Sequence, residues 1–386
     1  MIQLKETTWQ AVVRLNLNNF RCYTSLNLEI DPRPVVLTGA NGAGKTNILE
    51  ALSFLVPGRG LRRARLEDVT RQEAGNMASW IITARLELSK SNSSEISKII
   101  EIGTGRKVGS ERRLVQIDGQ KIRSQSMLSE VISAIWLTPT MDRLFSDGTA
   151  GRRRFLDRLV LGINPAHAKC ASDYEYSLQE RSRLLKTGRY DPMWISVLEK
   201  RMSYNGVMIA IARKRTVKYL NQVCANENGP FPSVRLNVVG SVENSLDSLD
   251  ITAAEVKLCD ALSTTRRTDA ENGGATIGTH RSDMLVYYGS KNQPAEQCST
   301  GEQKAILIAI VLGQAKIQAV IRGMSPILLL DEITAHLDKC RRIALFNQLC
   351  ELGIQSWLTG TDDSLFAELG ERGQFFHVND AVVKRQ

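Results

Sequence analysis

The amino-acid sequence predicts an α/β fold, a mixed β-sheet covered by helices, with a mainly helical lobe inserted into it. Two apolar stretches carry this prediction. Residues 35–37 lead through a glycine-rich turn into residues 47–55, whose apolar side chains recur at helical spacing. Residues 326–330 have the continuous apolar character of a strand buried on both faces of a sheet. Between these stretches, residues 152–223 have the pattern of a long helical region.

The segments around the first apolar stretch have the residues of strands and turns. A turn is expected at residues 31–34, which contain two prolines, and a hairpin tip is expected in the serine-rich residues 89–97. Strands are expected at residues 12–17, in a segment that ends near Ile30, and at residues 80–88, 97–102 and 356–359.

The helical region has clear interruptions. It is expected to break at Gly188 and at Asp191-Pro192. Polar connectors are expected at residues 226–233, 240–250 and 268–275, and a further helix at residues 305–321. We therefore expect a head formed by residues 1–165 and 270–386, and an inserted, mainly helical lobe at residues 166–269. No run of several heptads occurs, so no long coiled coil is expected.

The composition is that of a basic globular protein. Its 386 residues, of which 42% are hydrophobic, can form two domains or one domain with an insertion. The net charge of +9 favours a polyanionic partner, although scattered surface lysines would give the same total. The seven cysteines include no C-x-x-C pair, and the first residues have no secretory leader pattern. We expect a cytoplasmic protein without a membrane span, since apolar runs such as Ala305–Leu312 are shorter than the ~20 residues that a span needs.

The glycine-rich turn is a complete G-x-x-x-x-G-K-T motif. Its residues, called the phosphate loop below, are Gly39, Ala40, Asn41, Gly42, Ala43, Gly44, Lys45 and Thr46. In such a loop, backbone N–H groups turn toward phosphates, the lysine meets the β and γ oxygens, and the threonine hydroxyl ligates Mg²⁺. We therefore expect ATP and Mg²⁺ as cofactors, with Thr46 as a metal ligand. The alternative is an ordinary glycine-rich turn between a strand and a helix.

Two acids follow the apolar stretch 326–330. Asp331 is the expected second metal ligand, and Glu332 is the expected catalytic base that orients and deprotonates the attacking water. A buried strand followed by an acidic helix cap would contain the same residues. The phosphate loop elsewhere in the chain favours the catalytic interpretation.

A second phosphate-binding candidate precedes the expected helix at residues 305–321. Residues 298–304, called the signature segment below, resemble the L-S-G-G-Q signature of ABC-type ATPases. The residues at its binding positions are Ser299, Gly301 and Gln303. A helix N-terminus with free N–H groups can accept a γ-phosphate, although Ser299 and Glu302 also fit an ordinary capping box.

The order of these motifs indicates an ABC-type P-loop ATPase head. Asp338 resembles the acid of the D-loop in these ATPases. Their signature closes on ATP held by the phosphate loop of another subunit. Because this chain has one set of motifs, we expect a homodimer in the presence of ATP.

Several further segments resemble the RecF family, which belongs with the SMC-like ATPases. Residues 18–23 and 39–46 resemble the N-terminal pattern shared by the SMC, Rad50 and RecF ATPases, and residues 136–139, 151–157, 278–283 and 298–304 resemble the RecF family in order and spacing. Thr46 and Asp331 are 285 positions apart, which leaves room for a compact lobe but not for the long coiled-coil arms of SMC proteins. The chain departs from the ABC pattern after the strand at residues 356–359, where no switch histidine follows. Slow hydrolysis is therefore expected, with Thr359 or Thr361 as candidate substitutes.

The resemblance implies a recombination mediator of bacterial DNA repair. Proteins of this family bind ATP, dimerise on DNA and act with RecO and RecR at gaps and stalled forks, in replication restart and in the SOS response. The expected partners are double-stranded DNA and junctions of single and double strands, and the expected activity is a slow DNA-stimulated ATPase. Two other classes remain open. A transporter motor subunit conflicts with the inserted helical region, and an ATP-binding scaffold without turnover conflicts with the presence of Glu332.

Clusters of basic residues are the candidates for DNA contact. They include Arg62, Arg63, Arg65, Arg112 and Arg113. A solvated or salt-bridged surface explains any single cluster equally well. The family context makes Arg152–Arg154 a structural or nucleotide-sensing element, so these arginines are not assigned to DNA.

Overall fold

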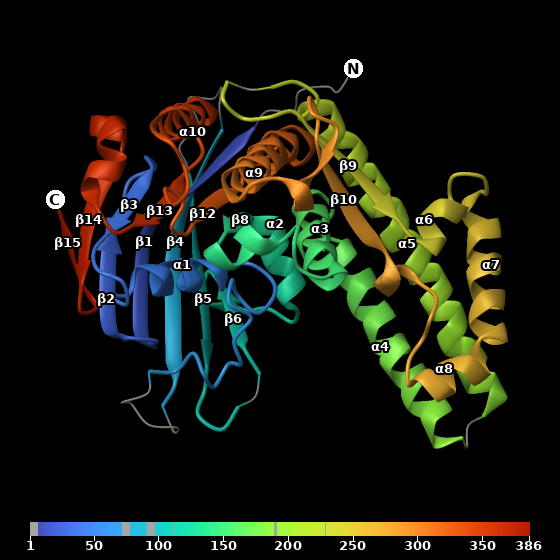
Figure 1. Ribbon diagram of the computed structural model, residues 1–386. Helices are drawn as coiled ribbons and strands as arrows, with labels where there is room; N and C mark the ends of the chain where they lie inside the picture. Colours follow the sequence, from blue (N-terminus) through green and yellow to red (C-terminus); the bar gives the residue numbers. More distant parts are fainter. Residues whose placement is uncertain (1–6, 72–77, 91–96, 111, 189–190, 228) are drawn as a thin grey trace. The chain divides into compact units, whose positions relative to one another are not determined.

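The computed structural model describes residues 7–71, 78–90, 97–110, 112–188, 191–227 and 229–386 (Figure 1). The chain forms two compact units, each with its own sheet and helices. The first unit consists of Met1–Asp142, Glu227–Phe231 and Thr300–Gln386, and the second of Arg143–Asn226 and Pro232–Ser299.

An antiparallel sheet forms one layer of the first unit. Its strands, in spatial order, are β2 (Tyr23–Glu29), β1 (Thr8–Phe20), β4 (Trp80–Lys90), β5 (Lys98–Arg106), β6 (Leu114–Ile117) and β7 (Gln120–Lys121). Buried and exposed residues alternate along most of β4, as expected when one face of a sheet packs on a core. The strands predicted at residues 12–17, 80–88 and 97–102 are confirmed, while residues 91–96 of the predicted hairpin tip lie outside the described residues.

The second sheet of this unit is mainly parallel. Its strands, in spatial order, are β15 (Val382–Arg385), β14 (Gln374–Asn379), β3 (Val35–Thr38), β13 (Ser356–Gly360), β12 (Ile327–Leu330) and β8 (Ala134–Leu137). All adjacent pairs are parallel except β14 and β15. Every residue of β3 and β12 is buried, which explains the apolar residues 35–37 and 327–330. Because β3, β13 and β12 are parallel neighbours, their C-terminal ends meet at one edge of the sheet.

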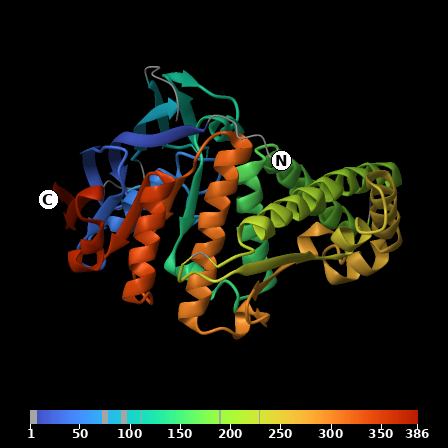
Figure 2. The same ribbon diagram turned by 90° about the horizontal axis from the view of Figure 1, so that it is seen from above.

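Helices and a shared core join the two sheets of the first unit. The helices are α1 (Lys45–Ser53), α2 (Leu128–Val131), α9 (Thr300–Arg322) and α10 (Lys339–Leu352), and α9 and α10 run side by side in both views (Figures 1 and 2). The main core cluster contains residues of both sheets and of α1. Within it, Phe20 meets Phe54 and Trp80 edge to face, and the rings of Phe54 and Trp80 are tilted against each other, with ring centroids 5.4–6.1 Å apart.

One helix among the described residues, α9, is long and apolar enough to cross a bilayer, contrary to the expectation from its apolar runs. Of its most apolar window, 72% is buried inside the protein. Its hydrophobic side chains therefore face the protein interior, as in the core helix of a globular domain.

The second unit contains six helices and a small antiparallel sheet among its described residues. The helices are α3 (Thr149–Ile163), α4 (His167–Thr187), α5 (Pro192–Val223), α6 (Ser241–Ser245), α7 (Ile251–Thr264) and α8 (Arg266–Asn272). The strands, in spatial order, are β11 (Gln293–Pro294), β10 (Asp283–Tyr288) and β9 (Val234–Val239). Short 3₁₀ segments among the described residues of both units are η2 (Gln125–Met127), η3 (Pro139–Arg143), η4 (Thr279–Arg281), η5 (Ala295–Gln297) and η6 (Asp363–Arg372).

The predicted helix breaks in the second unit are confirmed. Gly188 ends α4 in the left-handed conformation, and Asp191 caps α5 with Pro192 at its first position. A further break at Asn164, before Pro165, was not expected. The expected connector at residues 240–250 contains the short helix α6, and the one at residues 268–275 contains part of α8.

The second unit is also larger than the lobe predicted at residues 166–269. It begins before α3 because α3 packs against α5 and β10 rather than belonging to the head. It extends to Ser299 because β10 pairs with β9 along its whole length, from Asp283–Val239 to Tyr288–Val234. Pairing between strands that are distant in the chain sets this boundary, and no local feature of the sequence marks it.

Candidate functional site

The phosphate loop connects β3 to the N-terminus of α1, as the motif requires. Two of its glycines have backbone conformations and neighbours that exclude a side chain. A Cβ on Gly39, at φ +140°, would lie 2.1 Å from the carbonyl oxygen of Val378. A Cβ on Gly44, at φ +119°, would lie 2.6 Å from the hydroxyl of Tyr23, which donates a hydrogen bond to the Gly44 carbonyl. The surrounding core thus fixes the shape of the loop.

Lys45 is buried, and its ammonium group lies inside the curve of the phosphate loop. Its Nζ donates hydrogen bonds to the carbonyl oxygens of Gly39, at 2.7 Å, and Ala40, at 2.9 Å. It also lies 3.8 Å from Oε1 of Glu332. The lysine is therefore held between the loop and the acid expected to act as a base.

Asp331 and Thr46 lie together at the edge where the parallel strands end. The Thr46 hydroxyl donates a hydrogen bond of 2.9 Å to Oδ1 of Asp331, which is buried. Thr46 and Asp331, which are 285 positions apart in the chain, are thus in direct contact, because the C-terminal end of β12 lies beside the N-terminus of α1. A hydroxyl and a carboxylate in contact form the hard-oxygen set that Mg²⁺ prefers.

A third residue, Thr359 on β13, completes this arrangement. Its buried hydroxyl donates to Oδ1 of Asp331, at 2.8 Å, and accepts a hydrogen bond from the backbone N–H of Glu332, also at 2.8 Å. The sequence suggested Thr359 only as a substitute for a switch histidine, whereas the structure places it where it orients both acids. Thr361, the other candidate, is exposed just beyond the end of β13.

Lys304 is a site residue that sequence reasoning missed. Its buried Nζ donates a hydrogen bond of 3.2 Å to the carbonyl oxygen of Glu332 and pairs with Oδ2 of Asp142 at 3.5 Å. Burial lowers the pKa of Lys304, and the Asp142 carboxylate opposes this effect. The available signal was the position of Lys304 as the last residue of the signature segment. Glu332 itself has φ +48°, so its backbone is held in the left-handed region.

The residues of the signature segment differ in exposure. Ser299 is exposed, and Gly301 lies in the first turn of α9, where an added Cβ would be 3.6 Å from the His336 carbonyl oxygen. Gln303 is buried, so its side chain is not presented to a second subunit, contrary to expectation. Asp338 caps α10, since its Oδ1 accepts a hydrogen bond of 2.9 Å from the Arg341 N–H.

The arginines expected to contact DNA fall into two groups. Arg63 and Arg112 are exposed, and Arg65 is exposed beside Glu67 at 3.7 Å. The guanidinium of Arg62 already has partners within the chain. Its Nη1 donates hydrogen bonds to Oδ1 of Asn47, at 2.9 Å, and to Oε2 of the buried Glu50, at 3.3 Å.

The prediction that Arg113 contacts DNA is wrong. Arg113 is buried, and its guanidinium donates hydrogen bonds to Thr104 Oγ1 at 2.7 Å, to the Gly58 carbonyl at 2.9 Å and to the Phe54 carbonyl. Burial lowers the pKa of Arg113 to about 10. A guanidinium held inside the fold by backbone carbonyls cannot meet DNA phosphates directly.

Two segments are in contact within the second unit, residues 151–157 and residues 278–283. Their resemblance to the RecF family is more specific than that of the phosphate loop. Arg152 binds both carboxylate oxygens of Asp283 at 2.8 Å, and Arg153 donates to the Ser282 carbonyl at 2.9 Å. The expectation of a structural role for these arginines rested on the family alone, and the hydrogen bonds now supply a physical basis for it.

The fold and the loop geometry define the class as a P-loop ATPase head of the SMC type. The family model described as "RecF/RecN/SMC N terminal domain" matches residues 11–383. The DNA replication and repair protein RecF of Allorhizobium ampelinum is 44% identical over 371 residues, which cover 95% of this chain and 96% of that protein. RecF of Agrobacterium fabrum is 44% identical over 379 residues, with 97% and 98% covered.

The chain therefore belongs to the RecF family of DNA replication and repair proteins. A solved structure described as the recombination mediator protein RecF-ATPrS in the RecFOR pathway has the same fold, with a TM-score of 0.82 at 20% identity and coverage of 98% of this chain and 99% of that one.

Proposed function

We propose that this protein is an ATP-dependent DNA-binding recombination mediator, active at gaps and stalled forks in repair, replication restart and the SOS response. The observation that carries the proposal is the contact among Thr46, Asp331 and Thr359 beside Lys45. A solved structure described as the recombination mediator protein RecF-ATP in the RecFOR pathway, and relatives named DNA replication and repair protein RecF, support it. Action on the chromosome implies a cytoplasmic location, with RecO and RecR as partners.

The chemistry follows from the residues. Backbone N–H groups of the phosphate loop and the Lys45 ammonium bind the phosphates of ATP. Thr46 and Asp331 would hold Mg²⁺, which neutralises charge that develops on the phosphate oxygens. Thr359 keeps Asp331 in place for this role.

Glu332 orients the attacking water and accepts its proton. The left-handed backbone of Glu332, its N–H bond to Thr359 and its carbonyl bond from Lys304 all restrain the position of the carboxylate. We expect slow turnover because no histidine directly follows β13 to assist this step. A second copy supplies Ser299 to the γ-phosphate, so ATP binding closes a homodimer and doubles the DNA contacts.

Two substitutions test the proposal because they should act in opposite directions. Lys45→Ala removes the cation that faces the β and γ phosphates, so ATP-dependent dimerisation and DNA binding should be abolished. Glu332→Gln retains ATP binding but removes the base, so the ATP-bound dimer should persist on DNA. Sedimentation with gapped duplex DNA in ATP and in ADP, together with single-turnover hydrolysis, measures both effects.

Glu371→Gln changes an exposed acid of the same unit and is the matched control, which should behave as the unmodified protein. Hydrolysis by Glu332→Gln at the unmodified rate would show that Glu332 is not the base. Equal DNA affinity in ATP and ADP at several salt concentrations would rule out an ATP-controlled DNA-binding protein.

A further inference from the structure

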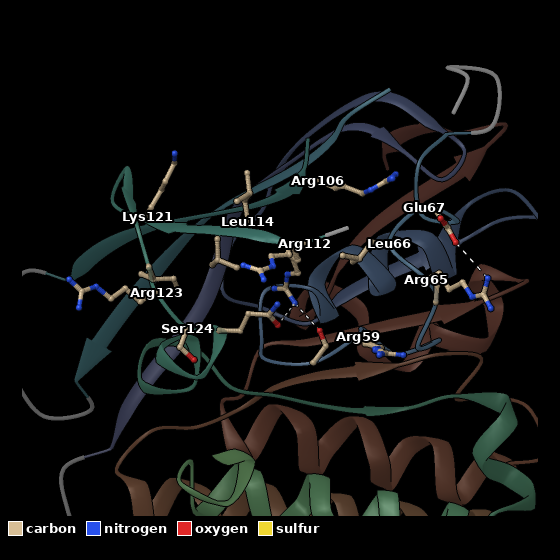
Figure 3. A pocket seen from close by; sticks show the side chains of 16 residues that line it. Arg59, Arg65, Leu66, Glu67, Arg106, Arg112, Leu114, Lys121, Arg123 and Ser124 are labelled. Atoms are coloured by element: carbon tan, nitrogen blue, oxygen red, sulfur yellow. Dashed lines mark hydrogen bonds and ion pairs between the residues drawn. The ribbon is translucent and has the colours of Figure 1, made fainter. Parts of the chain in front are cut away.

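A basic hollow lies in the first unit, outside the phosphate loop and the acids beside it. Its volume is about 1030 Å³, and its lining comes from two parts of the chain, residues 58–67 and residues 106–125. In Figure 3, Lys121 and Arg123 extend from the β6–β7 side of the hollow, while Arg59 and Arg65 come from the loop on the opposite side.

Positive charge dominates this hollow. Of its 16 lining residues, seven are lysine or arginine and one, Glu67, is acidic. Arg59, Arg112, Lys121 and Arg123 are exposed, and their side chains make no hydrogen bond or ion pair with any part of the chain that the structure describes. Unpaired cations that face one another across a hollow repel, so a polyanion in the hollow relieves this repulsion.

Arg113 holds the two sides of the hollow together from beneath. Its hydrogen bond to Thr104 lies on the β5 side, and its bonds to the Phe54 and Gly58 carbonyls lie on the loop side. The ring of Phe54 is 5.3 Å from its guanidinium carbon. Arg113 therefore acts as a positioning residue for the exposed cations and does not itself meet the polyanion.

The kind of polyanion follows from what else lines the hollow. None of the 16 lining residues is aromatic, so it has no platform on which unpaired bases could stack. Arginine and lysine side chains instead suit phosphate oxygens along a backbone. A duplex presents such a backbone with its bases stacked inside.

We propose that this hollow binds the phosphodiester backbone of duplex DNA, with Arg59, Arg112, Lys121 and Arg123 as the contacts. The inference rests on the proposed function, which requires DNA binding, and adds the site at which duplex DNA binds. Of these four residues, Arg59 and Arg112 belong to the arginine clusters that the sequence indicated as DNA candidates, whereas Lys121 and Arg123 do not.

The test compares two triple variants with equal changes in charge. In the first, Arg112, Lys121 and Arg123 are each replaced by Gln. In the control, the exposed cations Arg85, Lys98 and Lys384 of the same unit, which do not line the hollow, are each replaced by Gln. Binding of a 30-base-pair duplex in ATP is measured over a range of salt concentrations.

The hollow variant should bind at least 10-fold more weakly at low salt, and its slope of log affinity against log salt should be shallower by roughly three, one for each cation that no longer meets a phosphate. Its binding of a fluorescent ATP analogue should match the unmodified protein, because the substitutions lie outside the phosphate loop. The control should keep the unmodified slope.

Two further measurements separate the possible failures. Arg112→Gln alone should reduce the salt slope without a change in Tm, whereas Arg113→Gln should lower Tm, although the two residues are neighbours. If the hollow variant binds duplex as the control does, the inference is overturned while the proposed function stands. If the unmodified protein binds inorganic triphosphate in the presence of ATP and the hollow variant does not, while both bind duplex equally tightly, the hollow is a small-anion site and the inference is overturned. Failure of the unmodified protein to bind duplex overturns both proposals.

Discussion

At the scale of single residues, the candidate site depends on one threonine that resembles an ordinary strand residue in the sequence. Thr359 joins β13 to the end of β12 through its contacts with Asp331 and Glu332. A buried carboxylate without its donors is destabilised, because water cannot replace them. The hydroxyl of Thr359 therefore keeps Asp331 oriented toward Thr46.

Thr359→Val should separate this positioning role from that of a switch residue. Removal of the hydroxyl should cost about 1–3 kcal/mol at the Asp331 site, so the Mg²⁺ concentration required for ATP binding should rise about 10-fold or more. Thr359→Ser, which keeps the hydroxyl, is the control. A slower hydrolysis by Thr359→Val with an unchanged Mg²⁺ requirement would instead assign Thr359 to the γ-phosphate.

At the scale of elements, one carboxylate connects three helices of the second unit. Asp157 on α3 contacts Nε2 of His167 on α4 at 3.0 Å, and its two oxygens bind Arg213 on α5 at 2.8 and 2.9 Å. Burial raises the pKa of Asp157, but the hydrogen bond from His167 and the charge of Arg213 outweigh it and bring the pKa to about 2.

Asp157→Asn should therefore destabilise the protein in a pH-dependent way. The pKa is lower in the folded state than the unfolded value of about 3.9, so the ionised carboxylate stabilises the fold above pH 4 by about 2 kcal/mol. This contribution should disappear as the pH falls through about 2. Denaturant unfolding at pH 7 and pH 3 measures it, with Asp147→Asn, in an exposed ion pair, as the control. If Asp157→Asn and Asp147→Asn lower the free energy of unfolding equally, Asp157 does not stabilise the packing of α3 against α4 and α5.

At the scale of the whole molecule, the proposed activity requires two copies of the chain. The phosphate loop belongs to the first unit, and the exposed Ser299 ends the second. An ATP-bound dimer would combine the loop of one copy with Ser299 of the other. Because Gln303 is buried, the signature residues that remain for contact with the other copy are Ser299 and those in the first turn of α9.

A mixing experiment tests this arrangement. Ser299→Arg should bind ATP normally yet fail to dimerise, because a bulky side chain blocks the phosphate of the partner, whereas Lys45→Ala loses its own site. A mixture of the two variants leaves one intact loop facing one intact Ser299, so partial ATP-dependent dimerisation on DNA should return. Sedimentation of each variant and of the mixture measures it. A mixture as inactive as its components would count against the scheme.

The sequence by itself determined the parts of this protein that depend on neighbouring residues. The phosphate loop, the buried strand before Asp331 and the breaks at Gly188 and Pro192 were predictable, because glycine, proline and apolar runs constrain the backbone locally. The order of these segments was also sufficient to indicate the family.

Only the tertiary structure decided which distant residues meet. Neighbouring Arg112 and Arg113 have the same chemistry, yet one is exposed in the basic hollow and the other is buried beneath it. Thr359 became part of the site because three parallel strands end at one edge, and the second unit reached Ser299 because β9 pairs with β10. Burial and strand pairing depend on the packing of segments far apart in the chain, which local sequence patterns do not encode.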